Sequence, residues 1–260
     1  MAIALRTAAT GLQASSQAIK DDANNLANLN TNGYKRFKSS FYDLAYRTER
    51  RLGEDDKEIG LIQMGNGVAI SGMSSDFSPG EIIHTEGNGF NVAISGVGFF
   101  VITKPDGSIA YTRNGEFMKD SEGKIVMVGT GYQVGQQAIV IPDMGATDFT
   151  IKEDGTVSVM IDNAVQEIGR VEMANFINPN GLKRLGQHLF EESEGSGAPM
   201  FAYPDENNMG TVKQYYIEKS NVDPILSILS LTESSHWNNY SLKAFEVGAK
   251  IEDRLMDTRV

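Results

Sequence analysis

Large apolar residues recur at every seventh position along the first thirty residues, a spacing that restricts this segment to a helix. They are Leu5, Leu12, Ile19 and Leu26. Small residues lie between them at the same spacing, namely Ala2, Ala9, Ser16 and Ala23. The pattern predicts a long helix with a narrow seam along which other helices pack closely. An amphipathic helix that packs only on its own domain is the alternative.

The C-terminal region carries a second predicted helix with two apolar stripes. Asp223 is suited to cap this helix and Pro224 to occupy its first position. One stripe at helical spacing contains Leu226, Leu229, Tyr240, Ala244, Val247, Ile251 and Leu255. The second contains Ile225, Ile228, Leu231, Leu242 and Phe245. Two stripes call for two packing partners, and we expect the N-terminal helix as the first and another subunit as the second.

The middle of the chain has a different pattern. Residues 65–216 hold most of the glycines and three hairpin-type dipeptides, Asp106-Gly107, Asn114-Gly115 and Asp154-Gly155. Short apolar runs lie between such turns, at 91–94, 99–102, 125–128, 138–141 and 156–159. Several short strands separated by turns predict an all-β module.

These patterns predict an α+β fold. Long N- and C-terminal helices form a coiled-coil-like discontinuous domain, and an all-β domain is inserted between them. The expected bounds are 1–46 plus 218–260 for the helical domain, 47–75 for a connecting segment and 76–217 for the β-rich domain. The densest cluster of charges lies in 47–58, so the segment 47–64, taken by itself, is interpreted as a solvated linker or exposed loop.

Asparagines accumulate where the N-terminal helix should still continue: Asn24, Asn25, Asn28 and Asn30. Asparagine is a poor helix former because its amide competes for backbone hydrogen bonds. In a helix packed among copies of itself, each amide could donate and accept across the interface. The run therefore indicates assembly. The alternative is a fraying last turn that stops at Gly33.

Charge and composition exclude several classes of partner and site. The 260 residues have a formal net charge of -11, which is poorly matched to nucleic acid or anionic lipid. The chain has no cysteine, which excludes disulfides, zinc–thiolate sites and iron–sulfur clusters. No apolar run approaches transmembrane length. The first residues lack a basic stretch followed by a long apolar block, so we expect no cleaved signal peptide.

No pattern in the sequence supports catalysis. The glycines at 96 and 98 follow a predicted strand but lack the third glycine of a dinucleotide motif. His84, His188 and His236 lie far apart and have no metal-type spacing. We therefore predict no catalytic residue, cofactor or metal site. Two classes of function are compatible with this pattern: a structural filament subunit, or a secreted β-domain enzyme or binding protein with a helical oligomerisation stalk.

Ordered sequence blocks resemble the bacterial flagellar rod and hook family. Residues 23–28 (ANNLAN) and 31–36 (TNGYKR) resemble its N-terminal signature, and 91–101 (NVAISGVGFFV) resembles its central block, with Asn91 in place of the usual acid. Residues 111–117, 131–134 and 217–223 resemble later blocks in the same order. His236, Trp237 and Asn238 depart from the pattern of the last helix, as do Pro224, Phe245 and Glu246.

Within this family, residues 41–53 and 65–68 resemble the segment typical of the distal rod branch, and the proximal rod branch is the alternative. The resemblance implies a rigid hollow helical homopolymer that crosses the periplasm, transmits motor torque to the hook and carries exported subunits in its channel. Terminal helices would line the tube, with the β domain outside. Implied partners are other copies of the chain, the proximal rod proteins, the hook protein, the P- and L-ring proteins and the flagellar type III export apparatus.

Two sets of residues are expected to serve assembly. The assembly interface comprises Leu5, Leu12, Ile19, Asn24, Asn25, Leu26, Asn28, Leu226, Leu229, Tyr240, Val247 and Ile251. The segment expected to stiffen the rod contains Tyr46, Arg50, Gly53 and Ile59.

Overall fold

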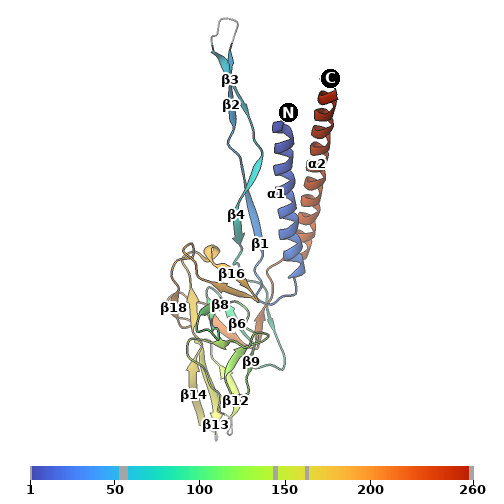
Figure 1. Ribbon diagram of the computed structural model, residues 1–260. Coiled ribbons are helices and arrows are strands. Elements are labelled where there is room, and N and C mark those ends of the chain that lie inside the picture. Colours follow the sequence, from blue (N-terminus) through green and yellow to red (C-terminus); the bar gives the residue numbers. More distant parts are fainter. Residues whose placement is uncertain (1, 53–57, 143–145, 162–163, 258–260) are drawn as a thin grey trace. The chain divides into compact units, whose positions relative to one another are not determined.

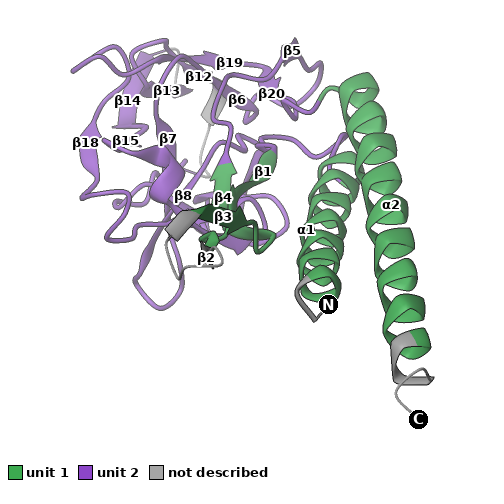
Figure 2. Cartoon of the chain, turned by 90° about the horizontal axis from the view of Figure 1, so that it is seen from above, with its two compact units in different colours: residues 1–27, 37–74, 223–260 green, residues 28–36, 75–222 purple. Residues whose placement is uncertain are grey.

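The computed structural model describes residues 2–52, 58–142, 146–161 and 164–257, which form two compact units. We call residues 1–27, 37–74 and 223–260 the helical unit, and residues 28–36 and 75–222 the β domain (Figure 2). Residues 37–74 belong to the helical unit, whereas the sequence pattern predicts a separate connecting segment at 47–75.

The helical unit contains two long helices, α1 (Ala2–Ala27) and α2 (Pro224–Asp257). The predicted start of α2 is confirmed, because Asp223 Oδ1 accepts hydrogen bonds from the backbone N–H groups of Ile225 and Leu226 at 2.8 and 3.0 Å. The helices lie side by side and antiparallel, with the start of α1 and the end of α2 at the same end of the pair (Figure 1).

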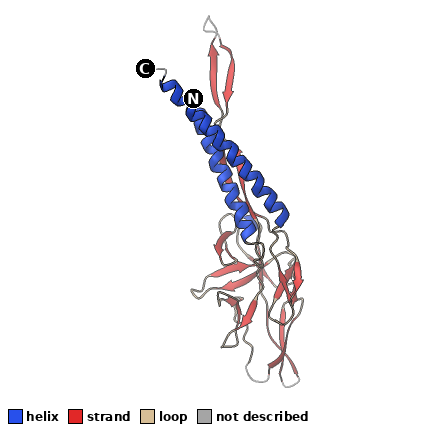
Figure 3. Ribbon diagram, turned by 90° about the vertical axis from the view of Figure 1, so that its right-hand side faces the viewer, coloured by secondary structure: helices blue, strands red, loops and turns tan. Residues whose placement is uncertain are grey.

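A long two-stranded ribbon completes the helical unit (Figure 3). Strand β1 (Phe37–Asp43) pairs with β4 (Val68–Ser75), and β2 (Arg47–Leu52) pairs antiparallel with β3 (Glu58–Met64). The interpretation of 47–64 as a linker or loop is therefore wrong for its described residues. The charged sequence of β2 lacks the pattern expected of a strand. The strand is identified only by its pairing with β3, in which Arg47 lies opposite Met64 and Arg50 lies opposite Leu61.

The β domain is built from short strands. The largest sheet has the order β16-β17-β8-β7-β11-β10-β9, and β15 and β18 extend it beside β7. Their bounds are β7 (Phe99–Thr103), β8 (Ile109–Thr112), β9 (Phe117–Lys119), β10 (Ile125–Met127), β11 (Gln133–Val134), β15 (Met173–Asn175), β16 (Lys183–Gly186), β17 (Leu189–Glu191) and β18 (Met200–Ala202).

The described strands of the β domain also form three smaller sheets. They are formed by β12 (Ala146–Ile151), β13 (Thr156–Ile161) and β14 (Ala164–Arg170); by β6 (Val92–Ser95) with β19 (Thr211–Gln214); and by β5 (Ile82–His84) with β20 (Tyr216–Glu218). A short 3₁₀ helix, η1, covers Pro179–Gly181.

Strand β7 is buried on both faces. Phe100 and Ile102 point into one apolar cluster, whereas Phe99 and Val101 point into a second. This follows from the two-residue repeat of a strand. It also explains why the run 99–102 contains no polar residue, as expected of a central strand.

The predicted strands and turns of this domain are mostly confirmed. The runs at 91–94, 99–102, 125–128 and 156–159 coincide with strands, and Asp106-Gly107 and Asp154-Gly155 lie in hairpin turns. The run 138–141 is not a strand, since Val140 makes only an isolated bridge with Lys124. Asn114-Gly115 is not a hairpin turn, because the strands on either side, β8 and β9, pair with other strands.

Candidate functional site

Small and polar side chains form the contact between α1 and α2. Asp22 accepts hydrogen bonds from the hydroxyls of Ser230 and Ser234, all at 3.0 Å. Farther along the pair, Asn238 Nδ2 donates to Ser15 Oγ at 3.0 Å. Much of the contact between the helices is therefore made by short polar side chains rather than by interlocking leucines, and the coiled-coil prediction is not confirmed.

This contact leaves the first predicted stripe of α2 facing solvent. We call its five exposed large side chains the outer stripe: Leu226, Leu229, Tyr240, Val247 and Ile251. Leu229 is 55% exposed and Tyr240 is 66% exposed. The predicted pairing of α2 with α1 is confirmed, but an apolar stripe does not mediate it, because the face of α2 that meets α1 carries serines and an asparagine. In the second predicted stripe, Ile225 and Ile228 are exposed as well.

In the helical unit many large apolar side chains are exposed to solvent, whereas a stable core would bury them. Among the described residues, Ala14 is the buried apolar residue that this unit contributes. The ribbon exposes large side chains as the outer stripe does, namely Tyr42, Tyr46, Leu61, Ile62 and Met73. Large apolar side chains exposed in such number are typical of sites where other protein surfaces bind.

The four heptad residues of α1 are intermediate between buried and exposed. Leu5, Leu12, Ile19 and Leu26 are each partly buried. Leu5 packs at Gly248 of α2, where a Cβ added to the glycine would lie 3.1 Å from Leu5 Cδ2. Part of each side chain therefore stays available to a neighbour, and a role of these residues in assembly stays a prediction.

Asn25 serves the fold of its own chain. Its side chain is buried, its Nδ2 donates to the carbonyl of Phe37 at 2.8 Å, and its Oδ1 accepts from the N–H of Phe37 at 3.1 Å. The prediction that this amide points outward to another subunit is therefore wrong. An asparagine amide has the geometry to satisfy one residue of a strand edge, and it fixes the start of β1 against α1.

The other asparagines behave differently. Asn24 is exposed on α1, and Asn28 follows the helix, where its Oδ1 accepts a hydrogen bond from the Thr31 hydroxyl at 3.2 Å. The alternative of a helix that stops at Gly33 is wrong, because α1 ends at Ala27 and Gly33, with a φ of 68°, lies in a later turn. A contribution of Asn24 and Asn28 to assembly stays a prediction.

The described residues that are expected to stiffen the rod lie along the ribbon. Tyr46 is exposed just before β2, Arg50 lies on β2 and Ile59 lies on β3. Gly53 lies outside the described residues.

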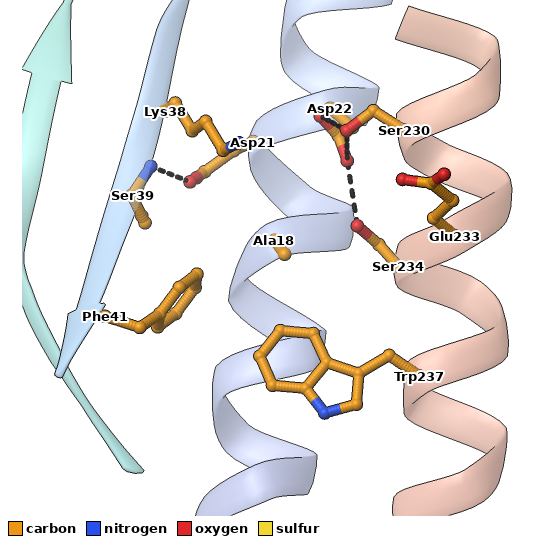
Figure 4. A pocket seen from close by; sticks show the side chains of 10 residues that line it. All are labelled: Ala18, Asp21, Asp22, Lys38, Ser39, Phe41, Ser230, Glu233, Ser234 and Trp237. Carbon is orange, nitrogen blue, oxygen red and sulfur yellow. Dashed lines mark hydrogen bonds between the residues drawn. The ribbon is translucent and has the colours of Figure 1, made fainter. Parts of the chain in front are cut away.

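A cavity of about 330 Å³ lies within the helical unit between α1, α2 and β1 (Figure 4). Phe41 and Trp237 line it, with their rings edge to face and 5.6 Å between centroids. Asp21, on the opposite side, accepts a hydrogen bond from the Ser39 N–H at 2.9 Å. Trp237, a departure from the family pattern, thus packs α2 against β1.

The β domain contains a buried ionic cluster that sequence reasoning missed. Lys35 Nζ lies 2.5 Å from Glu218 Oε1, and Arg113 Nη1 lies 3.6 Å from Glu218 Oε2. Burial lowers the pKa of Lys35 and that of Arg113, and the Glu218 carboxylate opposes both shifts. No sequence signal could have linked these residues, since 183 positions separate Lys35 from Glu218.

The described residues show no sign of metal chemistry. No three histidine, aspartate or glutamate side chains within the described ranges come together as metal ligands would. Neither of the two helices, over its described length, is both long and apolar enough to cross a membrane.

Comparisons with known proteins show the family of this chain. Residues 5–35 match the family model of flagella basal body rod proteins, and 93–159 match that of the flagellar hook protein FlgE/F/G D1 domain. The flagellar basal-body rod protein FlgG of Agrobacterium fabrum is 39% identical over 255 residues, which cover 95% of this chain and 93% of that protein. The chain belongs to the FlgG family of flagellar basal-body rod proteins.

A second relative extends this finding. FlgG of Caulobacter vibrioides is 37% identical over 255 residues, with the same coverage of both chains. Among solved structures, the flagellar hook protein FlgE2 of Helicobacter pylori is similar over 71% of this chain and 43% of its own, with a TM-score of 0.27 and 14% identity. The resemblance drawn from the sequence blocks is thus confirmed, and the family is one of structural proteins of the flagellar basal body.

Proposed function

We propose that this structural subunit of the flagellar distal rod polymerises by burying the outer stripe of α2 against neighbouring copies of the chain. The proposal rests on the burial pattern of the helical unit, in which the small residue Ala14 is buried and the large side chains of the outer stripe are exposed. An isolated helix pair with so small a core gains little from burial to offset its conformational entropy. Contact with further copies supplies the missing buried surface.

The polymer that follows is a hollow tube in the periplasm. The terminal helices line its channel, through which later subunits are exported, and the β domain lies outside. The tube transmits motor torque to the hook. Its partners are the proximal rod proteins, the hook protein, the P- and L-ring proteins and the type III export apparatus. The role is structural, without catalysis. A proximal rod protein or a secreted binding protein with a helical stalk is less well supported, since FlgG relatives match 95% of the chain.

Replacing Leu229 by glutamate tests the proposed interface. Because Leu229 is 55% exposed in the single chain, the fold should be unaffected, within about 0.5 kcal/mol. In the polymer the new carboxylate would be buried without a partner, which should raise the critical concentration for polymerisation about 100-fold or more. Pelleting of the purified chain at increasing concentration measures this.

Asn239→Glu is the matched control, since it adds the same charge at an exposed polar position of α2 outside the outer stripe. It should polymerise at a concentration within about threefold of the unmodified chain. If Leu229→Glu polymerised as readily as the control, the outer stripe would not be the interface.

We further propose that the ribbon formed by β2 and β3 stiffens the rod. An isolated two-stranded ribbon is only marginally stable in water, and this one exposes Leu61 and Ile62, so packing against neighbouring copies would order it. Its charges contribute little, because exposed ion pairs are worth only about 0–1 kcal/mol. Deleting residues 47–64 should therefore leave polymers that bend more easily. Electron micrographs provide the persistence length, and straight tubes from the deletion variant would contradict this role.

A further inference from the structure

The ionic cluster of the β domain carries more positive than negative charge. Lys35 and Arg113 are two cations and Glu218 is one anion, and their side chains are between 0 and 4% exposed. Asp76 does not balance the excess, because it forms an exposed ion pair with Arg36 at 2.8 Å. An uncompensated charge in a buried site is costly, and the cost falls when a counter-charge is bound nearby.

Arg113 also has unused hydrogen-bonding capacity. Its Nη2 donates to the carbonyl of Gly96 at 2.7 Å. Its Nε is buried and has no hydrogen-bond partner within the described part of the chain. Its Nη1, also buried, is ion-paired at 3.6 Å with Glu218 Oε2, but neither atom has a hydrogen-bond partner among the described residues. A guanidinium has five N–H donors in a planar fork, whose best partner is a carboxylate.

Arg113 lines a cavity of about 290 Å³ in the β domain. The other walls are mainly apolar, from Phe77, Pro79, Phe99 and Pro179. The guanidinium carbon of Arg113 lies 5.7 Å from the centroid of the Phe99 ring. Val97 also lines the cavity and is 48% exposed, so the cavity is open to solvent at this residue.

We propose that this cavity, the Arg113 pocket, binds an aspartate or glutamate side chain of a neighbouring copy of the chain. The carboxylate would neutralise the excess charge beside Arg113, and the apolar walls would cover the aliphatic and backbone part of the incoming segment. Each copy can supply such a residue, because the chain has 34 acidic residues against 23 lysines and arginines. The proposal rests on the proposed function, since it requires that copies associate, and it adds a contact made by the β domain.

Two substitutions of Val97 test the sign of the charge that the pocket binds. Val97→Glu places a carboxylate at the opening of the pocket. This carboxylate can occupy the site itself, and it repels the carboxylate of the neighbouring copy. The critical concentration for polymerisation should rise about tenfold. Val97→Lys introduces a side chain of similar length and opposite charge, and should leave the critical concentration within about twofold or lower it. Equal effects of the two variants, or no effect of either, would overturn the proposal.

Arg113→Met separates docking from folding. It leaves Lys35 and Glu218 as a balanced pair, so the melting temperature of the β domain should stay within a few degrees of the unmodified chain while the critical concentration rises about tenfold. Arg170→Met is the control, because Arg170 belongs to the same domain and pairs with Glu206 outside the pocket. A variant Arg113→Met that melts much earlier and polymerises normally would assign Arg113 a purely structural role.

The two proposals can fail separately. If Leu229→Glu polymerises like the unmodified chain, the outer stripe is not the interface, whatever the Val97 variants do. If Leu229→Glu fails to polymerise while Val97→Glu and Val97→Lys behave alike, the assembly surface stands and the Arg113 pocket does not.

Discussion

Replacing Glu218 by alanine is expected to lower the free energy of unfolding of the β domain by about 3–5 kcal/mol. The variant would leave Lys35 and Arg113 buried, both cationic and without an anion. It would also remove the acceptor for the N–H of Gly80, which donates to Glu218 Oε1 at 2.9 Å. Each lost partner of a buried donor adds to the cost, since water cannot replace it.

Urea unfolding followed by hydrogen exchange measures this loss in the β domain. The single tryptophan, Trp237, belongs to the helical unit, so its fluorescence reports on that unit separately. Glu206→Ala is the matched control, because Glu206 forms a partly exposed ion pair with Arg170 and should cost no more than about 1 kcal/mol. A Glu218→Ala variant as stable as this control would show that the cluster does not need its anion.

Gly115→Ala should destabilise the β domain by about 4 kcal/mol or prevent its folding. A Cβ on Gly115 would overlap the carbonyl oxygen of Val92. The two residues are also tied by a hydrogen bond from the Val92 N–H to the Gly115 carbonyl at 3.0 Å. Val92 is fully buried at the start of β6, so its backbone cannot move aside without disturbing the core.

Gly107→Ala provides the comparison for Gly115→Ala. Gly107 has a φ of 82° in an open hairpin turn, with nothing near its Cβ position, so its substitution should cost only the backbone strain of about 1 kcal/mol. Thermal melting of the two variants distinguishes steric exclusion from strain. Equal losses of thermal stability in the two variants would mean that the backbone of Val92 moves aside, and that the close approach at Gly115 is not required.

Local patterns were sufficient to predict several elements. Asp223 and Pro224 mark the start of α2 because capping depends only on residues within one turn. The run 99–102 becomes β7, and Asp154-Gly155 becomes a turn, for similarly local reasons. The family followed from blocks of sequence in order along the chain, and the apolar stripe of α2 could be read from its spacing alone.

Patterns that depend on distant partners could not be read in this way. The charged run of β2 became a strand because β3 pairs with it, and Asn25 turned inward because the backbone of Phe37 lies beside it. Asn114-Gly115 has the composition of a hairpin turn, yet Gly115 is required by the approach of Val92. In each case the deciding contact comes from another element of the chain.

The sequence by itself determined the family, the two terminal helices, most strands of the β domain and the existence of an apolar stripe on α2. Only the tertiary structure decided that α1 meets the serines of α2 and leaves Leu226 and Leu229 exposed, and that Lys35, Arg113 and Glu218 share one buried site. Periodicity and capping depend on neighbours within a few residues, whereas the choice of a packing face or of a charge partner depends on groups that chain folding alone brings together.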